Sequence, residues 1–156
     1  MLRVSKLTDY ATVILTHIAH QPDELHAASD ITQATDVALP TVSKVLKLLS
    51  KANILNSHRG SKGGYLLTRT PKDVHVAEII TAIEGPIAMT ECTTHTGACE
   101  QESSCEIKGN WNLINRAVYM ALEAVTLADM VAPVRQQAVM VNMPLKTQTN
   151  DLKVEN

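Results

Sequence analysis

The chain has 156 residues and a formal net charge of −2, with 45% hydrophobic residues and only 3% aromatic residues. This hydrophobic content excludes an intrinsically disordered chain, and the length suits one domain with a tail. No apolar run reaches the about 18 to 20 residues that a membrane span needs, so we expect no membrane partner. The first residues lack the apolar segment of a signal peptide, and we expect a cytoplasmic protein with reduced thiols.

The small net charge conceals an uneven distribution along the chain. Residues 1–75 carry a net charge of +3, and residues 76–156 carry a net charge of −5. Within the first half, residues 40–72 hold seven Lys and Arg side chains and no Asp or Glu. A basic segment of this kind is typical of proteins that bind nucleic acid, although the average charge suggests the opposite.

Hydrophobic periodicity predicts three helices at the start of the chain. The first covers residues 8–20, with Thr8 as the N-cap and Asp9 in the first turn, where the helix dipole favours an acid. A short second helix covers residues 27–34, and a third covers residues 39–52 with a proline in its first turn.

Two short strands, residues 54–58 and 65–68, follow the third helix and flank a tip with three glycines. We expect these glycines to adopt positive φ angles in a tight hairpin. A fourth helix covers residues 76–84 and is ended by Gly85 and Pro86. Residues 87–106 show no periodicity and hold every cysteine of the chain.

The sequence after the cysteines predicts one long helix over residues 107–132. Its apolar residues alternate at spacings of four and three, which is the seam of a coiled coil: Ile107, Trp111, Ile114, Val118, Ala121, Val125, Ala128 and Ala132. The chain thus divides into a DNA-binding region at 1–86, a cysteine loop at 87–106, a dimerisation helix at 107–135 and a disordered tail at 136–156.

The order of the first elements predicts the fold class. Two helices, a turn, a third helix and a hairpin form a mainly α winged helix-turn-helix domain with a two-stranded wing, which binds double-stranded DNA. Small polar and cationic side chains at the start of the third helix suit the major groove, and a basic glycine-rich tip suits phosphates or the minor groove. The predicted DNA-binding residues are Thr41, Ser43, Lys44, Lys47, Arg59, Ser61 and Lys62.

The three cysteines predict a metal centre. Cys92, Cys99 and Cys105 are separated by six and five residues, and an odd number of thiols cannot all pair within one chain. Structural zinc favours closer cysteine pairs, so these gaps suit an iron–sulfur cluster better. One alternative is a zinc site in which His95 completes the three thiolates. The other is that the three thiols bind no cofactor. The fourth cluster ligand could be His95, an acid elsewhere or water.

Particular motifs resemble the Rrf-type winged-helix regulators, the family of the iron–sulfur assembly repressor IscR and the nitric-oxide-sensing repressor NsrR. The matching runs are ALPTVSKVLKLLSKANIL from residue 38, HRGSKGGYLL from residue 58 and VAEIITAIEG from residue 76, followed by the spaced cysteines. The resemblance covers about residues 1–135. The opening run MLRVSKLTDYAT most resembles the branch that regulates the SUF cluster-assembly operon.

The resemblance implies a homodimer, paired or swapped through the long helix, with a cluster on Cys92, Cys99 and Cys105. In the IscR type the fourth ligand is a His three residues after the last cysteine, but this chain has Lys108 there. In the NsrR type it is an Asp near the N-terminus of the partner subunit, which Asp9 matches. By this analogy a [4Fe–4S] cluster is favoured and a [2Fe–2S] cluster is possible. The resemblance therefore predicts Asp9 as the fourth ligand, and the alternative is that Asp9 is an ordinary acid in the first turn of a helix.

The resemblance predicts a DNA-binding regulator, most simply a repressor, that senses iron–sulfur cluster status and controls the SUF operon. A nitric oxide or oxidative-stress sensor with the same ligands is one alternative. An iron–sulfur electron-transfer or scaffold protein is an alternative of another class, although it would need neither the acid-free segment nor the wing. No enzyme is expected, because no histidine forms a motif with a cysteine and no nucleotide-binding loop is present.

Overall fold

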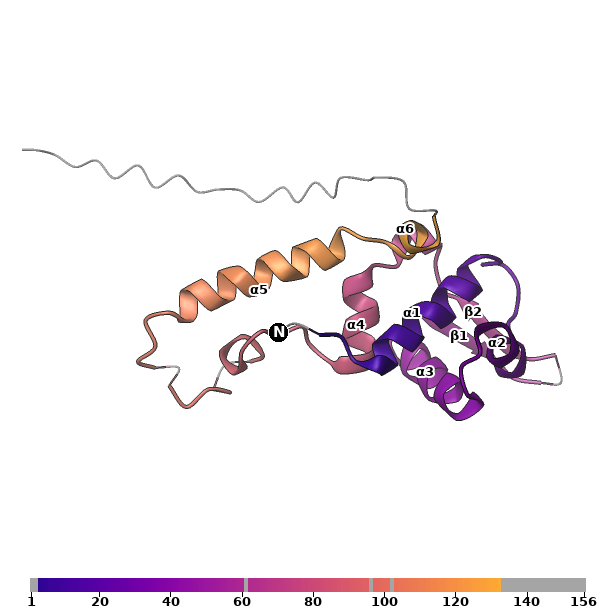
Figure 1. Cartoon of the computed structure of the whole chain (residues 1–156), viewed down its shortest axis with the longest axis horizontal. Coiled ribbons are helices and arrows are strands. Elements are labelled where there is room, and N and C mark those ends of the chain that lie inside the picture. The colour runs from indigo at the N-terminus through magenta and orange to yellow at the C-terminus, as the bar shows by residue number, and fades with distance from the viewer. Residues whose placement is uncertain (1–2, 61, 96, 102, 133–156) are drawn as a thin grey trace, which may run out of the picture.

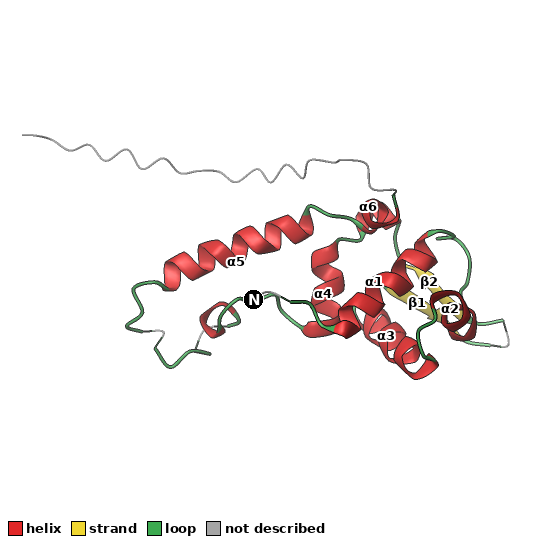
Figure 2. Cartoon of the chain, viewed as in Figure 1, coloured by secondary structure: helices red, strands yellow, loops and turns green. Residues whose placement is uncertain are grey.

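The computed structural model describes residues 3–60, 62–95, 97–101 and 103–132, and its described part is mainly α-helical (Figures 1 and 2). Ser61 and the predicted tail lie outside the described residues. The elements in chain order are α1 (Lys6–Ala19), α2 (Ala28–Thr35), α3 (Leu39–Lys51), β1 (Leu55–His58), β2 (Gly64–Leu67), the 3-10 turn η1 (Pro71–Asp73), α4 (Val76–Glu84), the 3-10 turn η2 (Glu91–Thr93), α5 (Lys108–Glu123) and α6 (Leu127–Val131). The predicted winged helix-turn-helix arrangement is confirmed.

A single hydrophobic core holds α1, α2 and α3 together. Ile14, Leu15 and Ile18 of α1 are fully buried, as is Ile31 of α2. On α3 the buried residues recur at spacings of three and one, so that one side of the helix faces the core and the other faces solvent. Asp36, with a φ of 56°, ends α2 in the left-handed conformation and turns the chain into α3.

The first helix begins earlier than the sequence predicts. Ser5 is the N-cap of α1, and its hydroxyl accepts a hydrogen bond from the Thr8 N–H at 3.2 Å. Thr8, the predicted N-cap, is instead buried in the first turn. Its hydroxyl donates a hydrogen bond to Glu84 at the end of α4, and this distant partner is what the local pattern could not show.

The wing is an antiparallel hairpin in which Leu55 pairs with Leu67 and His58 with Gly64. The expectation of positive φ angles is right only for Gly60, whose φ is 126°. Gly63 is needed for space, because a Cβ atom there would lie 2.3 Å from the His58 carbonyl oxygen. The three glycines therefore serve two different purposes.

The predicted helix over residues 107–132 is wrong as one continuous element. Helix α5 ends at Glu123, because the chain then pairs with the start of α4: the Val76 N–H donates to the Val125 carbonyl at 2.9 Å, and the Leu127 N–H donates to the Val74 carbonyl at 2.7 Å. Leu127 is fully buried in the core, and α6 contacts α1. The predicted seam therefore stops at Ala121 within α5.

Helix α5 differs from the rest of the fold in its exposure. It contains no buried residue, and its Leu113 side chain is 69% exposed. Figure 1 shows α5 extending away from α1, α2 and α3, with the wing on the opposite side of the molecule. In the described part of the chain, no helix combines the length and the apolar content needed to cross a membrane.

Candidate functional site

Helix α3 places the predicted base-reading residues on the side that faces away from the core. Lys44 and Lys47 are exposed, and Thr41 and Ser43 are half-buried beside them. Lys51 is also exposed and continues the same row, one turn after Lys47. Neither Lys44 nor Lys47 forms an ion pair with any described residue. The structure therefore presents an unneutralised cationic row on one face of α3.

The wing extends this cationic surface. Arg59 and Lys62 lie at the hairpin tip, and both are exposed. The tip is narrow because the Gly63 N–H donates to the Gly60 carbonyl at 3.0 Å. Ser61 was predicted beside these two cations but lies outside the described residues. A narrow cationic tip of this kind has the shape that enters a DNA groove or follows its phosphates.

One cation of the acid-free segment is not available for DNA. Arg69 donates a hydrogen bond to Glu78 on α4, with 2.6 Å between its guanidinium nitrogen and the carboxylate oxygen. The charge pattern of residues 40–72 does not reveal this ion pair, because Glu78 lies beyond the end of that segment. Arg69 and Glu78 are nine residues apart, and this spacing does not correspond to neighbours on a helix or a strand, so the sequence could not reveal the pair.

The three cysteines lie on a segment of turns between α4 and α5. Cys92, Cys99 and Cys105 are half-buried free thiols. Cys92 is in the 3-10 turn η2, and its sulfur lies 3.1 Å from the Thr90 hydroxyl oxygen. Partial burial keeps each thiol close to the surface, where it can bind a metal from solution.

The start of the cysteine segment is attached to α5 by one side chain. The Asn115 amide donates to the Ile87 carbonyl at 3.1 Å, and its carbonyl oxygen accepts from the Met89 N–H at 3.0 Å. The Asn115 amide on α5 thus holds two peptide groups of one short backbone stretch before Cys92. Sequence reasoning missed Asn115, because it lies outside the apolar seam and its partners are 26 and 28 residues away in sequence.

Asp9 lies in the first turn of α1, as predicted, and its side chain is exposed. Its backbone carbonyl accepts from the Thr12 hydroxyl, but its carboxylate forms no hydrogen bond with the described residues. An unengaged carboxylate on the surface is free to bind a group on another molecule. His95, the alternative ligand, is also exposed within the cysteine segment.

The described residues do not bring the predicted ligands together. No group of three or more His, Cys, Asp and Glu side chains among them is close enough to hold a metal ion. The chemistry of the donors nevertheless fits an iron–sulfur cluster, since three free thiols on one short segment are the ligands that such clusters take. The described residues of this segment form turns and one 3-10 turn rather than an α-helix.

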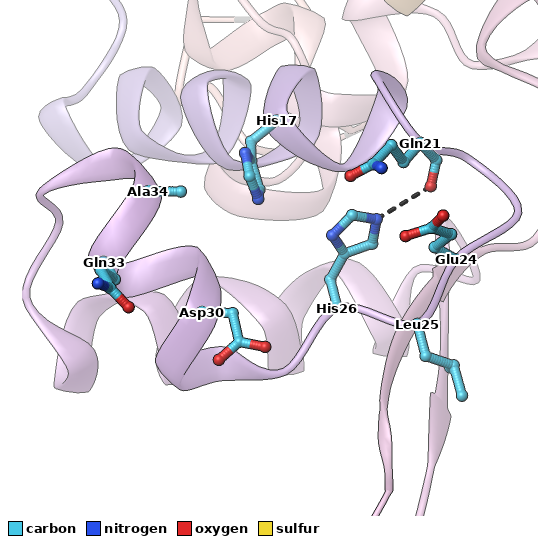
Figure 3. A pocket seen from close by; sticks show the side chains of 8 residues that line it. All are labelled: His17, Gln21, Glu24, Leu25, His26, Asp30, Gln33 and Ala34. Carbon is cyan, nitrogen blue, oxygen red and sulfur yellow. Dashed lines mark hydrogen bonds between the residues drawn. The ribbon is translucent and has the colours of Figure 1, made fainter.

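A separate cavity of about 450 Å³ lies between the end of α1, the loop after it and α2 (Figure 3). Two imidazole rings meet edge to face there, with 5.4 Å between the ring centroids of His17 and His26. Burial lowers the pKa of His17, and the neighbouring His26 and His20 lower it further. The backbone of His26 exchanges hydrogen bonds of 3.0 and 2.9 Å with Tyr65, so this loop pairs with the wing.

Comparison with known proteins identifies the family. A family profile described as "Rrf2: Iron-dependent Transcriptional regulator" matches residues 4–133. The chain belongs to the Rrf2 family. This chain is a transcriptional regulator of that family, and its relatives are named as transcriptional regulators rather than enzymes.

Three relatives cover most of this Rrf2 chain. The HTH-type transcriptional regulator NsrR of Halalkalibacterium halodurans is 25% identical over 132 residues, which is 83% of this chain and 90% of that protein. The structure resembles CymR, the global cysteine regulator of B. subtilis, with a TM-score of 0.66, 26% identity and coverage of 84% and 97%. It also resembles T. potens IscR, with a TM-score of 0.62, 25% identity and coverage of 83% and 86%.

Proposed function

We propose that this Rrf2-family regulator is a homodimeric repressor that binds an operator through α3 and the wing and senses iron–sulfur cluster status. The observation that carries the proposal is the combination of an unpaired cationic row on α3 with three free thiols on one segment. Residues 1–86 would bind DNA, residues 87–106 would hold the cluster and residues 107–135 would mediate dimerisation. Such a protein works in the cytoplasm, where the chromosome and the reduced thiols are found.

The DNA contacts follow from the exposed side chains. The start of α3 enters the major groove, where Thr41, Ser43 and Lys44 reach base edges and Lys47 contacts a phosphate. Arg59 and Lys62 of the wing contact the neighbouring backbone or minor groove, with Ser61 between them. Two such surfaces in a dimer match two half-sites about one helical turn apart.

The exposure of α5 supports the homodimer. Ile107, Leu113 and Ile114 are 55%, 69% and 43% exposed, which is unusual for large apolar side chains on one helix. The seam of Ile107, Trp111 and Ile114 has the spacing with which two helices pack together. A second copy of α5 packed along this seam would bury the side chains of Ile107, Trp111 and Ile114.

Four side chains would hold the cluster: Cys92, Cys99 and Cys105 of one subunit and Asp9 of the other. A bound cluster, [4Fe–4S] or [2Fe–2S], supplies iron that reacts with oxygen or nitric oxide. The exposed Asp9 carboxylate would then connect the cysteine segment of one subunit to α1 of its partner. This connection would hold the two α3 helices at one separation, and its loss would shift the dimer toward another separation. Feedback control of the SUF operon is the regulatory role that we propose, and a nitric oxide response uses the same residues.

Anaerobic purification tests this proposal most directly. The absorption spectrum, the iron and sulfide content and the native mass of the protein report the cluster and the dimer together. We expect operator affinity to change in the variant with all three cysteines replaced by alanine. Unchanged operator affinity in that variant, with a cluster confirmed in the wild type, would refute the sensing mechanism.

The fourth ligand is tested by comparing three variants. Asp9→Ala should alter the cluster spectrum and accelerate cluster loss, whereas His95→Ala should not. Asp30→Ala is the matched control, because Asp30 is also an exposed acid in the first turn of a helix. If Asp9→Ala behaves like Asp30→Ala, then Asp9 is not a ligand.

A further inference from the structure

We propose that Glu84 is a positioning residue that ties the base of the cysteine segment to the start of α1, and so transmits the state of the cluster to the DNA-binding helices. This inference rests on the proposed function, because it concerns how the same cluster site acts on DNA. It assigns a role to a carboxylate that is neither a proposed cluster ligand nor a DNA contact.

The geometry places Glu84 between the two functional parts. It is the last residue of α4, and Gly85, with a φ of 91°, turns the chain into the cysteine segment. One oxygen of its carboxylate, Oε1, accepts a hydrogen bond from the Ser5 N–H at 2.8 Å and another from the Thr8 hydroxyl. These partners lie 79 and 76 residues away in sequence, and Thr8 is followed directly by Asp9.

The first turn of α1 is organised around this carboxylate. Ser5 is the N-cap, its hydroxyl accepts from the Thr8 N–H, and the Thr8 side chain is only 3% exposed. The hydrogen bonds from Thr8 and Ser5 hold the pKa of Glu84 below its ordinary value, so the carboxylate is charged at neutral pH. A charged acceptor at the N-terminus of a helix also interacts favourably with the helix dipole.

Packing is loose next to Glu84, so its hydrogen bonds add to the positioning of α1 at this point. A cavity of about 470 Å³ adjoins Glu84, and it is lined by residues from the N-terminal segment, the start of the cysteine segment and α5, including Val4, Ile87 and Val118. Close-packed interiors transmit small displacements, but an open groove does not. The two hydrogen bonds to the Glu84 carboxylate therefore join the first turn of α1 to the end of α4 beside this cavity, in addition to the packing of the two helices.

The consequence concerns both clusters of the proposed dimer. The Glu84 carboxylate fixes the base of the segment that holds one cluster, and it also fixes the turn that offers Asp9 to the other cluster. Without Glu84, the subunit still folds around its core, since α1 and α4 also pack against each other. The cluster would then no longer determine the orientation of α1 relative to α4.

The experiment measures operator affinity with and without the cluster in four full-length dimeric proteins: wild type, Glu84→Ala, Glu84→Gln and Asp129→Ala. The last is a matched control. Asp129 is likewise an exposed carboxylate that accepts from a backbone N–H and a threonine hydroxyl, but its partner is Thr126 of the same short helix. Glu84→Ala and Asp129→Ala therefore each lose two hydrogen bonds to a carboxylate, but only those of Glu84 are donated by the start of α1.

We expect Glu84→Ala to accelerate cluster loss by about fivefold and to bring the ratio of the two operator affinities close to one, with the affinity of the cluster-free protein unchanged. Glu84→Gln should restore most of the ratio, because its amide oxygen can accept both hydrogen bonds. Thr8→Val, which removes one donor and leaves the carboxylate, should reproduce part of the effect.

Wild-type behaviour of Glu84→Ala, or an equal change in Asp129→Ala, would overturn the inference. If Glu84→Ala does not fold, then Thr8→Val decides the question, because a wild-type ratio of the two operator affinities in Thr8→Val would overturn the inference. Absence of iron and sulfide from the anaerobic wild-type protein would refute the proposed function instead, and this measurement distinguishes the two failures.

Discussion

The cationic row on α3 leads to a quantitative prediction about salt dependence. Lys44 and Lys47 are exposed and have no ion-pair partner among the described residues, so in the complex each can neutralise a DNA phosphate or contact a base beside one. Replacing both with alanine removes two cations from each subunit and four from a dimer. Since each neutralised phosphate contributes about 0.9 to the slope of log K against log salt concentration, the slope should fall by up to about 3.6.

The assay is a fluorescence-anisotropy titration of an operator duplex at several salt concentrations. Arg69→Ala is the matched control, because Arg69 belongs to the same acid-free segment but is paired with Glu78. It should leave the slope and the affinity nearly unchanged. If the slope of the Lys44→Ala, Lys47→Ala protein equals that of the wild type, then α3 does not lie against the DNA phosphates and the assigned interface is wrong.

Three further predictions concern the fold and its response to pH. Leu127→Ala should lower the free energy of unfolding by about 2 to 5 kcal/mol, because the side chain is fully buried. Gly63→Ala should destabilise the wing by about 1 to 3 kcal/mol and weaken operator binding, since its Cβ would meet the His58 carbonyl. The pKa of His17 is lowered in the folded protein, chiefly by burial, so the unfolded chain binds the proton more readily. The contribution of neutral His17 to the free energy of unfolding is therefore fully present above the unfolded pKa of 6.5 and is lost as the pH falls below it. His17→Gln should reduce this loss of stability.

Each of these predictions has a measurement and a control. Urea unfolding reports the first, and the exposed Met130→Ala variant on the same helix should change stability by less than about 0.5 kcal/mol. For the wing, Gly109→Ala is the comparison, because nothing lies within 4 Å of a Cβ atom there; equal operator binding by the two glycine variants would contradict the steric argument. Urea unfolding at about pH 7.5 and pH 5.5 tests His17, with the exposed His58→Gln as the control. An unchanged pH dependence in His17→Gln would show that its burial does not govern the response.

Much of the winged helix-turn-helix part was predictable because its signals are local. Hydrophobic spacing located α1, α2 and α3 to within two residues, and a proline, a glycine cluster and a Gly-Pro pair marked the boundaries. The same spacing placed Lys44 and Lys47 on the solvent side of α3, since residues opposite a buried stripe must face outward. The order of helices and strands then predicted the winged helix.

Local pattern was insufficient wherever a distant partner decides the structure. The seam from Ile107 continues past Glu123 in sequence, but the Val76 N–H donates to the Val125 carbonyl and the helix ends there. Burial of Leu127 stabilises the break. The sequence likewise gives no sign of the ion pair between Arg69 and Glu78. It also gives no sign of the two hydrogen bonds that Glu84 accepts from the start of α1.

The division between the two levels has a physical cause. Residue order alone determined the helical periodicity, the wing and its cationic tip, and the presence of three thiols on one segment, because each depends on neighbours in the chain. Tertiary packing alone decided where α5 stops, which arginine is neutralised and how α1 is joined to the cysteine segment. Those features arise from side chains that meet only after the core has formed, when burial and hydrogen bonding between distant residues outweigh local preference.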